Sequence, residues 1–133
     1  MRIVIADVSD LMRERLQQML CPIEQLEILG AFSNGTETLE ALRTLKPDLA
    51  ILDIEMPGLS GLQVLSEICK EGKGFKFIIL TLFSSNYHKK LAIQSGADYF
   101  FSKVDDFEKV GLLVREMIAK YGTEISKRVI RLM

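Results

Sequence analysis

Two patterns of hydrophobic positions alternate along the chain. Between runs of consecutive apolar residues, the apolar positions recur at the spacing of a helix with one buried face. The runs are short and continuously apolar, as is typical of strands buried on both faces. They lie at Ile3–Ala6, Leu26–Phe32, Leu49–Leu52, Phe75–Leu80 and Tyr99–Phe101. Strands that alternate with helices predict a parallel sheet, because parallel strands need crossover connections.

The helical segments can be placed from their apolar stripes and their start signals. Ser60 precedes Gln63 at the spacing of a capping box, and so does Asp105 before Glu108. Asp10 is expected to cap the first helix. The weakest helical pattern lies at Tyr87–Ser95, and the other stripes are Met12, Leu16, Met19 and Leu20; Leu39, Leu42 and Leu45; Leu62, Leu65 and Ile68; and Val110, Leu113, Val114, Met117 and Ile118.

Polar side chains follow four of the five predicted strands. Asp7 closes the first strand, Asp53 the third and Thr81 the fourth, and Lys103 follows the fifth. We predict a doubly wound α/β fold with a five-stranded parallel sheet in the flavodoxin-like order 2-1-3-4-5, in which these strands are consecutive neighbours. Ligands of such sheets bind at the carboxyl ends of the strands. The four side chains are therefore expected to form one site.

Composition narrows the function classes. The 133 residues are 48% hydrophobic and 26% charged, which suits a single compact domain. A formal net charge of −1 gives no electrostatic footprint for nucleic acid, so no direct nucleic-acid partner is expected. The apolar run at the start meets Asp7 too soon for a signal peptide, and no segment is long enough to span a membrane. A cytoplasmic protein with buried, reduced thiols at Cys21 and Cys69 is expected.

The four strand-end residues suit phosphoryl transfer. A carboxylate such as Asp53 can attack a phosphoryl group when positive charge stabilises the equatorial oxygens. Asp7 would help to hold Mg²⁺, which prefers oxygen ligands and keeps several waters. Lys103 supplies a mobile positive charge and Thr81 a hydroxyl donor. Each residue also has an ordinary structural explanation, since acids at strand ends often cap helices and a lone lysine is usually solvated. Their combination favours a phosphoryl site.

Three stretches carry a resemblance to a known family. They are Ile5-Ala6-Asp7-Val8-Ser9-Asp10-Leu11-Met12-Arg13, Pro47-Asp48-Leu49-Ala50-Ile51-Leu52-Asp53-Ile54-Glu55-Met56-Pro57-Gly58 with Gly61, and Gly96-Ala97-Asp98-Tyr99-Phe100-Phe101-Ser102-Lys103. Over residues 1–120 the chain resembles the response-regulator receiver domain, in particular chemotaxis-type single-domain regulators of bacterial two-component systems.

The resemblance implies a role for each site residue. Asp53 would accept a phosphoryl group from a histidine kinase or phosphotransfer protein. Asp7, Asp53 and the backbone carbonyl of Glu55 would hold Mg²⁺. Thr81 and Lys103 would contact the phosphoryl group and carry the switch, with Phe100 at the aromatic switch position or simply in the core. Such a chain is not an enzyme beyond intrinsic self-phosphorylation and dephosphorylation.

Departures from the family pattern predict altered control. Val8 occupies the position of a second acid, so Mg²⁺ binding is expected to be weak, or absent without phosphorylation; Asp10 could compensate, although capping is the simpler role. Leu82 is bulky where a small residue is usual and is expected to restrict access. Glu55 and Phe83 flank the acceptor and are expected to control hydrolysis. Val104 replaces the usual cis proline after Lys103, so a trans bond is expected.

Residues 121–133 form a tail outside the receiver pattern. Ile125, Val129 and Leu132 share one helical face, so the tail either extends the last helix, docks on a partner or frays. It is too short for a DNA-binding output domain. A stand-alone regulator, expected as a monomer or weak homodimer, would signal to an unknown protein target through the face made by the fourth helix, fifth strand and fifth helix.

Two other functions compete with a phosphorylated switch. Val8 and Leu82 favour an atypical receiver that serves as a phosphorylation-independent protein-interaction module. A phosphohydrolase similar to the haloacid dehalogenases also combines a nucleophilic Asp with a Ser or Thr and a Lys, but it uses a second Asp where Glu55 stands here.

Overall fold

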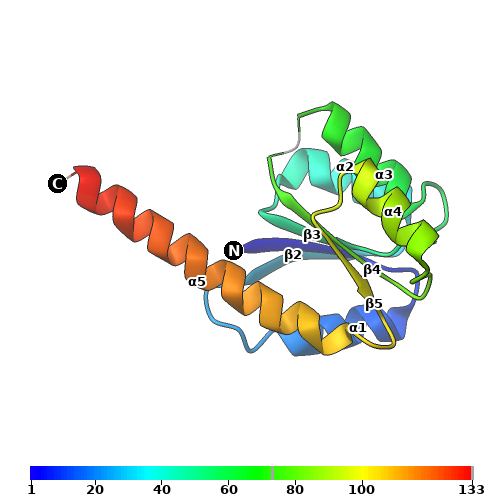
Figure 1. Cartoon of the computed structure of the whole chain (residues 1–133), viewed down its shortest axis with the longest axis horizontal. Helices are drawn as coiled ribbons and strands as arrows, with labels where there is room; N and C mark the ends of the chain where they lie inside the picture. Colours follow the sequence, from blue (N-terminus) through cyan, green and yellow to red (C-terminus); the bar gives the residue numbers. More distant parts are fainter. Residues whose placement is uncertain (73, 133) are drawn as a thin grey trace.

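A computed structural model of the chain describes residues 1–72 and 74–132, and the side chains of residues 1–72 and 74–120. Strands and helices alternate along the described residues (Figure 1). The five strands are all parallel and lie in the order β2-β1-β3-β4-β5, which confirms the predicted fold class. The elements are β1 (Arg2–Ala6), α1 (Asp10–Leu20), β2 (Glu27–Phe32), α2 (Gly35–Leu45), β3 (Leu49–Leu52), α3 (Gly61–Lys70), β4 (Lys76–Thr81), α4 (Asn86–Ser95), β5 (Tyr99–Ser102) and α5 (Phe107–Leu132).

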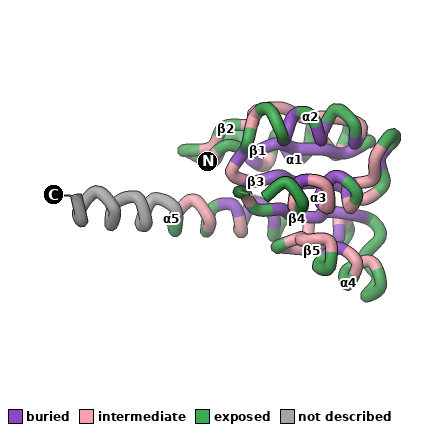
Figure 2. Tube along the Cα trace, turned by 90° about the horizontal axis from the view of Figure 1, so that it is seen from above, coloured by how far each residue is buried: buried purple, intermediate pink, exposed green. Residues whose placement is uncertain are grey.

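The sheet is the middle layer of three. Helices α1 and α5 cover one face, and α2, α3 and α4 cover the other (Figure 1). Successive residues of a strand point to opposite faces, so Ile3 and Ile5 of β1 pack toward α1 and α5 while Val4 and Ala6 pack toward α2 and α3. The central strands are therefore buried on both sides, which explains their continuously apolar sequence (Figure 2).

Two of the three helix starts predicted from the sequence need correction. The capping box of Ser60 and Gln63 at α3 is confirmed. At α1, however, the cap is Ser9, whose hydroxyl accepts a hydrogen bond from the Met12 N–H at 3.2 Å. Asp10 was expected there, but its backbone is already helical and its carboxylate pairs with Arg13 instead. The extended backbone of Ser9 is what allows a side chain to reach back to the first turn.

The last helix begins at Phe107, one residue later than the Asp105 cap implied. The residue before it is Asp106, whose carboxylate accepts the Ser102 N–H at 2.9 Å and pairs with Lys109 at 2.8 Å. Although α5 extends to Leu132, neither it nor any other helix of the described residues is long and apolar enough to cross a membrane. The apolar face expected for the tail lies outside the described side chains.

The two cysteines are free, but they are less buried than their apolar surroundings in the sequence suggested. Cys21 is exposed and Cys69 is half-buried. Cys21 is the residue that follows α1, at the start of the connection to β2. The expectation of two buried thiols is therefore wrong for Cys21.

Two glycines let helices begin in direct contact with backbone near the end of β3. A Cβ atom on Gly61 would lie 1.8 Å from the carbonyl oxygen of Asp53, and the Gly61 N–H donates to the Ile54 carbonyl at 2.7 Å. A Cβ atom on Gly35 would lie 1.8 Å from the carbonyl oxygen of Leu59. Any larger residue would push α3 away from the end of β3 or α2 away from the following loop, so these glycines help to fix the position of Asp53.

Candidate functional site

Two buried carboxylates lie side by side at the carboxyl edge of the sheet. Asp7 follows β1 and Asp53 follows β3, and these strands are hydrogen-bonded neighbours. The sheet ladder continues beyond both strands, because the Asp53 N–H donates to the Ala6 carbonyl and the Asp7 N–H donates to the Phe32 carbonyl, each at 3.0 Å. The backbone at both acids is thus held by the sheet rather than by a free loop.

Lys103 joins the two carboxylates. Its Nζ lies 2.6 Å from Oδ2 of Asp7 and 2.7 Å from Oδ2 of Asp53, and the lysine side chain is only 5% exposed. The remaining carboxylate oxygens accept backbone hydrogen bonds, Asp7 Oδ1 from the Ser9 N–H at 2.9 Å and Asp53 Oδ1 from the Ile54 N–H at 2.7 Å. Three of the four strand-end side chains that were predicted to form one site therefore meet.

The protonation of this group of charges follows from burial and pairing. Burial raises the pKa of Asp7, and the hydrogen bonds from Lys103 and Ser9 offset only part of that effect. Burial by itself would lower the pKa of Lys103, but its hydrogen bonds to Asp53 and Asp7 outweigh burial, so the pKa of the lysine is raised. The ammonium group consequently stays charged and neutralises one of the two carboxylates.

A pocket of about 550 Å³ opens above these charges. Most of the residues singled out in the sequence line it, including Val8, Glu55, Leu82 and Phe83. Their positions agree with an influence on access and metal binding, while the roles themselves stay predictions. The full lining is Asp7, Val8, Ser9, Asp53, Glu55, Met56, Pro57, Leu82, Phe83 and Lys103.

Thr81 and Phe100 do not line this pocket. Thr81 is fully buried at the end of β4, where its hydroxyl oxygen accepts the Phe83 N–H at 3.0 Å and its carbonyl accepts the Lys103 N–H at 2.9 Å. Phe100 is half-buried on β5 and packs against the apolar cluster beneath α2, α3 and α4. The fourth strand-end residue is thus next to the site, but its side chain is engaged with the loop that follows β4.

The loops around the site explain two further expectations. No cis peptide bond occurs in the described residues, so Lys103 is followed by a trans bond as expected. Asp10 lies outside the carboxylate pocket and is exposed beside Arg13. Its position does not support the idea that Asp10 replaces the missing metal ligand.

Arg13 is a site residue that the sequence argument missed. Its Nη1 donates to the backbone carbonyl of Asp7 at 2.6 Å and so fastens the loop between β1 and α1. The available signal was an arginine in the first turn of the helix that follows a strand-end acid, where its long side chain can reach back to the loop.

The donors present can be compared with what a divalent cation needs. Among the described side chains, no group of three or more His, Cys, Asp or Glu residues is arranged to hold a metal ion. The pocket nevertheless has two buried carboxylates, Asp7 and Asp53, and enough volume for several waters, which fits Mg²⁺ because this ion keeps part of its hydration shell. Val8 adds no oxygen to this set.

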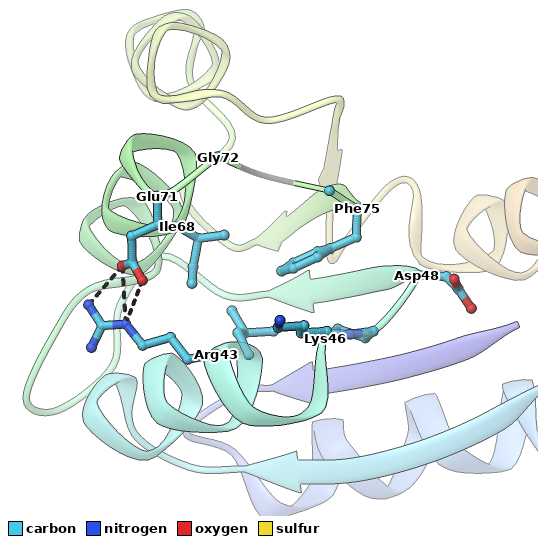
Figure 3. Close-up of a pocket in the computed structure, with 10 residues that line it drawn as sticks. Arg43, Lys46, Asp48, Ile68, Glu71, Gly72 and Phe75 are labelled. Carbon is cyan, nitrogen blue, oxygen red and sulfur yellow. Dashed lines mark hydrogen bonds and ion pairs between the residues drawn. The ribbon is translucent and has the colours of Figure 1, made fainter.

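A second pocket, of about 630 Å³, lies between α2, α3 and the amino ends of β3 and β4 (Figure 3). Arg43 of α2 closes one side by a bidentate ion pair with Glu71, with Nε–Oε1 and Nη2–Oε2 distances of 2.9 and 2.8 Å. Phe75 and Ile68 form part of its apolar wall. It is larger than the carboxylate pocket but lies at the opposite edge of the sheet, away from Asp53.

Comparisons with known proteins agree with this geometry. A family model described as the response regulator receiver domain matches residues 3–115. The uncharacterized transcriptional regulatory protein YvfU of Bacillus subtilis is 33% identical over 117 residues, which cover 88% of this chain and 58% of that protein. The chain spans about half the length of the curated relatives it matches.

Solved structures give the same result. A DNA-binding response regulator of the LuxR family from Staphylococcus aureus superposes with a TM-score of 0.80 at 30% identity, covering 86% of this chain and 96% of that one. The CheX-CheY-BeF3-Mg complex from Borrelia burgdorferi superposes with a TM-score of 0.77 at 27% identity, covering 89% and 87%.

Proposed function

This chain belongs to the response regulator receiver family, and on that premise we propose that it accepts a phosphoryl group on Asp53 and signals through protein–protein contacts. Receiver domains act in two-component signal transduction, generally bind Mg²⁺ and interact with histidine kinases or phosphotransfer proteins. The observation that carries the proposal is the buried Asp53 carboxylate, held by Lys103 at the floor of an open pocket. The family match favours this function over a haloacid-dehalogenase-like hydrolase.

The chemistry proposed for Asp53 is a phosphoryl transfer. A carboxylate oxygen of Asp53 forms a bond to phosphorus while the bond from phosphorus to the donor nitrogen of a phosphohistidine breaks, and its electron pair stays on that nitrogen. Lys103 donates hydrogen bonds to the incoming oxygens, and its charge offsets their negative charge. Because the Ile54 N–H already holds Asp53 Oδ1, the carboxylate is oriented before the donor arrives.

Asp7, Asp53 and the backbone carbonyl of Glu55 are the groups we propose to hold Mg²⁺. When bound, the ion would supply positive charge to the phosphoryl oxygens. Val8 leaves one position to water, so binding is expected to be weak and to improve once a phosphoryl group adds oxygen ligands. The partly neutralised carboxylates support this expectation, because Lys103 competes for the same oxygens.

The switch is proposed to run through Thr81 and Phe100. To donate a hydrogen bond to a phosphoryl group on Asp53, the Thr81 hydroxyl moves toward the pocket, and this shifts the hydrogen bond that its oxygen accepts from the Phe83 N–H. Such a movement changes the loop before α4, and Phe100 on the neighbouring strand packs beneath that helix. We propose that a protein target recognises the resulting surface change on the face of α4, β5 and α5. The chain is proposed to act in the cytoplasm as a monomer or weak homodimer.

Phosphorylation with a small-molecule phosphodonor and Mg²⁺ tests this function. The wild-type chain is expected to gain one phosphoryl group, seen by mass spectrometry of the intact protein and located at Asp53 in its peptides. The Asp53→Asn variant, which keeps the shape of the side chain, should gain none. Absence of incorporation at saturating donor and Mg²⁺, or a modification elsewhere that survives Asp53→Asn, would count against the proposal.

Phe83→Ala is expected to shorten the lifetime of the phosphorylated state several-fold. The Phe83 ring lines the acceptor pocket, where it should obstruct a water that approaches in line with the scissile bond. Decay of the phosphorylated protein, followed by mass spectrometry after removal of the donor, measures this. Tyr87→Ala is the matched control, because Tyr87 is an exposed aromatic residue outside the pocket lining. Equal decay in Phe83→Ala and the wild type would refute the role of the ring.

A second candidate function is a receiver-shaped interaction module that works without phosphorylation. One specific observation favours it: the side chain at the position of the second acid, Val8, is apolar and half-exposed at the mouth of the pocket. An exposed valine gives nothing to a cation but can contact a protein. The phosphorylation test above separates the two candidates.

A further inference from the structure

Three large apolar side chains surround the mouth of the carboxylate pocket. Val8 is 49% exposed, Leu82 is 64% exposed and Phe83 is 41% exposed, and all three line the same pocket. They come from two loops, between β1 and α1 and between β4 and α4. Single exposed apolar residues are ordinary on protein surfaces, but several around one concavity are a feature of binding sites. We call Val8, Leu82 and Phe83 the apolar collar.

The loop after β3 completes the wall of the pocket. Met56 and Pro57 line it on that side, so apolar side chains border the opening from three different loops. Water in such an opening is released when a partner's apolar side chain enters, which is the arrangement of an anchor residue in a docking pocket. The depth is limited by Lys103 and its two carboxylates, so the space suits one side chain rather than an extended ligand.

The charges that line the pocket predict which kind of residue lies next to the anchor residue in the partner. Asp7 and Asp53 share the ammonium of Lys103, whereas Glu55 is exposed and has no ion pair among the described side chains. The lining therefore holds three carboxylates and one ammonium, an excess of negative charge. An acidic site with an apolar mouth is complementary to a basic residue next to an apolar one, and it disfavours anionic partners.

We propose that the apolar collar docks a protein segment that presents one bulky aliphatic side chain beside a lysine or arginine. The aliphatic side chain enters between Leu82 and Phe83, and the cation pairs with Glu55. Docking does not require phosphoryl transfer, because the collar is formed with Asp53 unmodified. It thus gives the chain a contact that operates before, or without, any phosphorylation.

The probe is a short synthetic peptide with one leucine between lysines on an alanine background. Titration into isotope-labelled protein is followed by NMR shifts of backbone amides. The collar predicts that the largest shifts fall at Ser9, Glu55 and Phe83. Two sister peptides, with the leucine changed to alanine or the lysines changed to glutamate, should bind at least about tenfold more weakly, since each loses one element of the complementarity.

Variants of the protein distinguish specific binding at the apolar collar from non-specific binding. Leu82→Ser should weaken binding of the leucine peptide by about tenfold or more. Leu112→Ser is the matched control, because Leu112 is 66% exposed on α5 and its loss should leave binding unchanged. Asp53→Asn should still bind the peptide while failing to accept a phosphoryl group, so failure of the docking proposal is distinguishable from failure of the proposed function.

Several outcomes would overturn the proposal. These are the absence of shifts up to the solubility limit of the peptide, shifts centred away from the collar, and equal binding by the Leu82→Ser and Leu112→Ser variants. Self-association of the free chain that Leu82→Ser abolishes would also overturn it, because the collar would then take a second copy of this chain. Melting temperatures of both serine variants, measured alongside, confirm that each is folded.

Discussion

Val8→Asp is expected to bind Mg²⁺ about ten- to a hundredfold more tightly than the wild type. Val8 lines the pocket together with Asp7 and Asp53, so a carboxylate at this position faces the same space. Two opposite unit charges at 4 Å attract by about 4 kcal/mol at an effective dielectric of 20. Most of this attraction does not appear as a gain in affinity, because water already fills the missing coordination position and the added carboxylate repels its neighbours in the metal-free state. A net gain of about 1–3 kcal/mol remains.

The measurement is the melting temperature with and without Mg²⁺, since an ion that binds only the folded state stabilises it by mass action. Val8→Asp should show the larger Mg²⁺-dependent increase and faster phosphorylation by a small donor. Two controls isolate the effect. Val8→Asn adds a polar side chain without charge, and Val104→Asp adds the same charge at an exposed position outside the pocket lining. If wild-type protein binds Mg²⁺ as tightly as Val8→Asp, Val8 does not mark a missing ligand.

Lys103→Met is expected to lower the free energy of unfolding at neutral pH by about 3 kcal/mol, or the melting temperature by roughly 10 °C. Methionine keeps much of the side-chain volume but leaves the buried carboxylates of Asp7 and Asp53 without their shared cation. Exposed ion pairs are screened by solvent, so Lys109→Met, which removes the solvent-exposed partner of Asp106, should change stability little. Chemical denaturation of both variants provides the comparison.

A second substitution tests whether charge is the cause. Asp53→Asn removes one of the two carboxylates, so the Lys103→Met/Asp53→Asn double variant should recover a large part of the lost stability. The sign of the pH dependence is also fixed. Burial raises the pKa of Asp7, so the folded state takes up a proton before the unfolded state does. Lys103 lowers the pKa of Asp7, so its loss raises that pKa further, and the deficit of Lys103→Met should shrink as Asp7 of the variant becomes protonated at falling pH. A constant deficit at all pH values would indicate lost packing.

Much of the fold could be predicted because its local signals agree with the tertiary structure. Val4 and Ile5 illustrate this: both are apolar because β1 is covered on both faces, and that requirement is visible in the sequence itself. The start of α1 could not be assigned in the same way. Ser9 and Asp10 are both good caps, and the choice depends on backbone angles: Ser9 is extended, whereas Asp10 is already helical.

The candidate site, like the fold, could be predicted only in part. Strand order brings Asp7, Asp53 and Lys103 together whatever the details of packing, so their meeting follows from topology. The direction of the Thr81 hydroxyl does not follow from topology, because it depends on the turn that presents the Phe83 N–H. The collar could not be foreseen either, since the exposure of Leu82 is set by the conformation of the loop after β4.

The close glycine contacts near β3 hold α2 and α3 more tightly to the sheet than the packing of α4 does. Gly61 of α3 packs against the Asp53 carbonyl at the end of β3, and Gly35 of α2 packs against the Leu59 carbonyl in the loop that follows, so we expect α2 and α3 to move together with this end of β3. By contrast, α4 buries only Ala92 among its residues. A displacement that begins at Asp53 is therefore expected to move α4 more readily than α2 or α3.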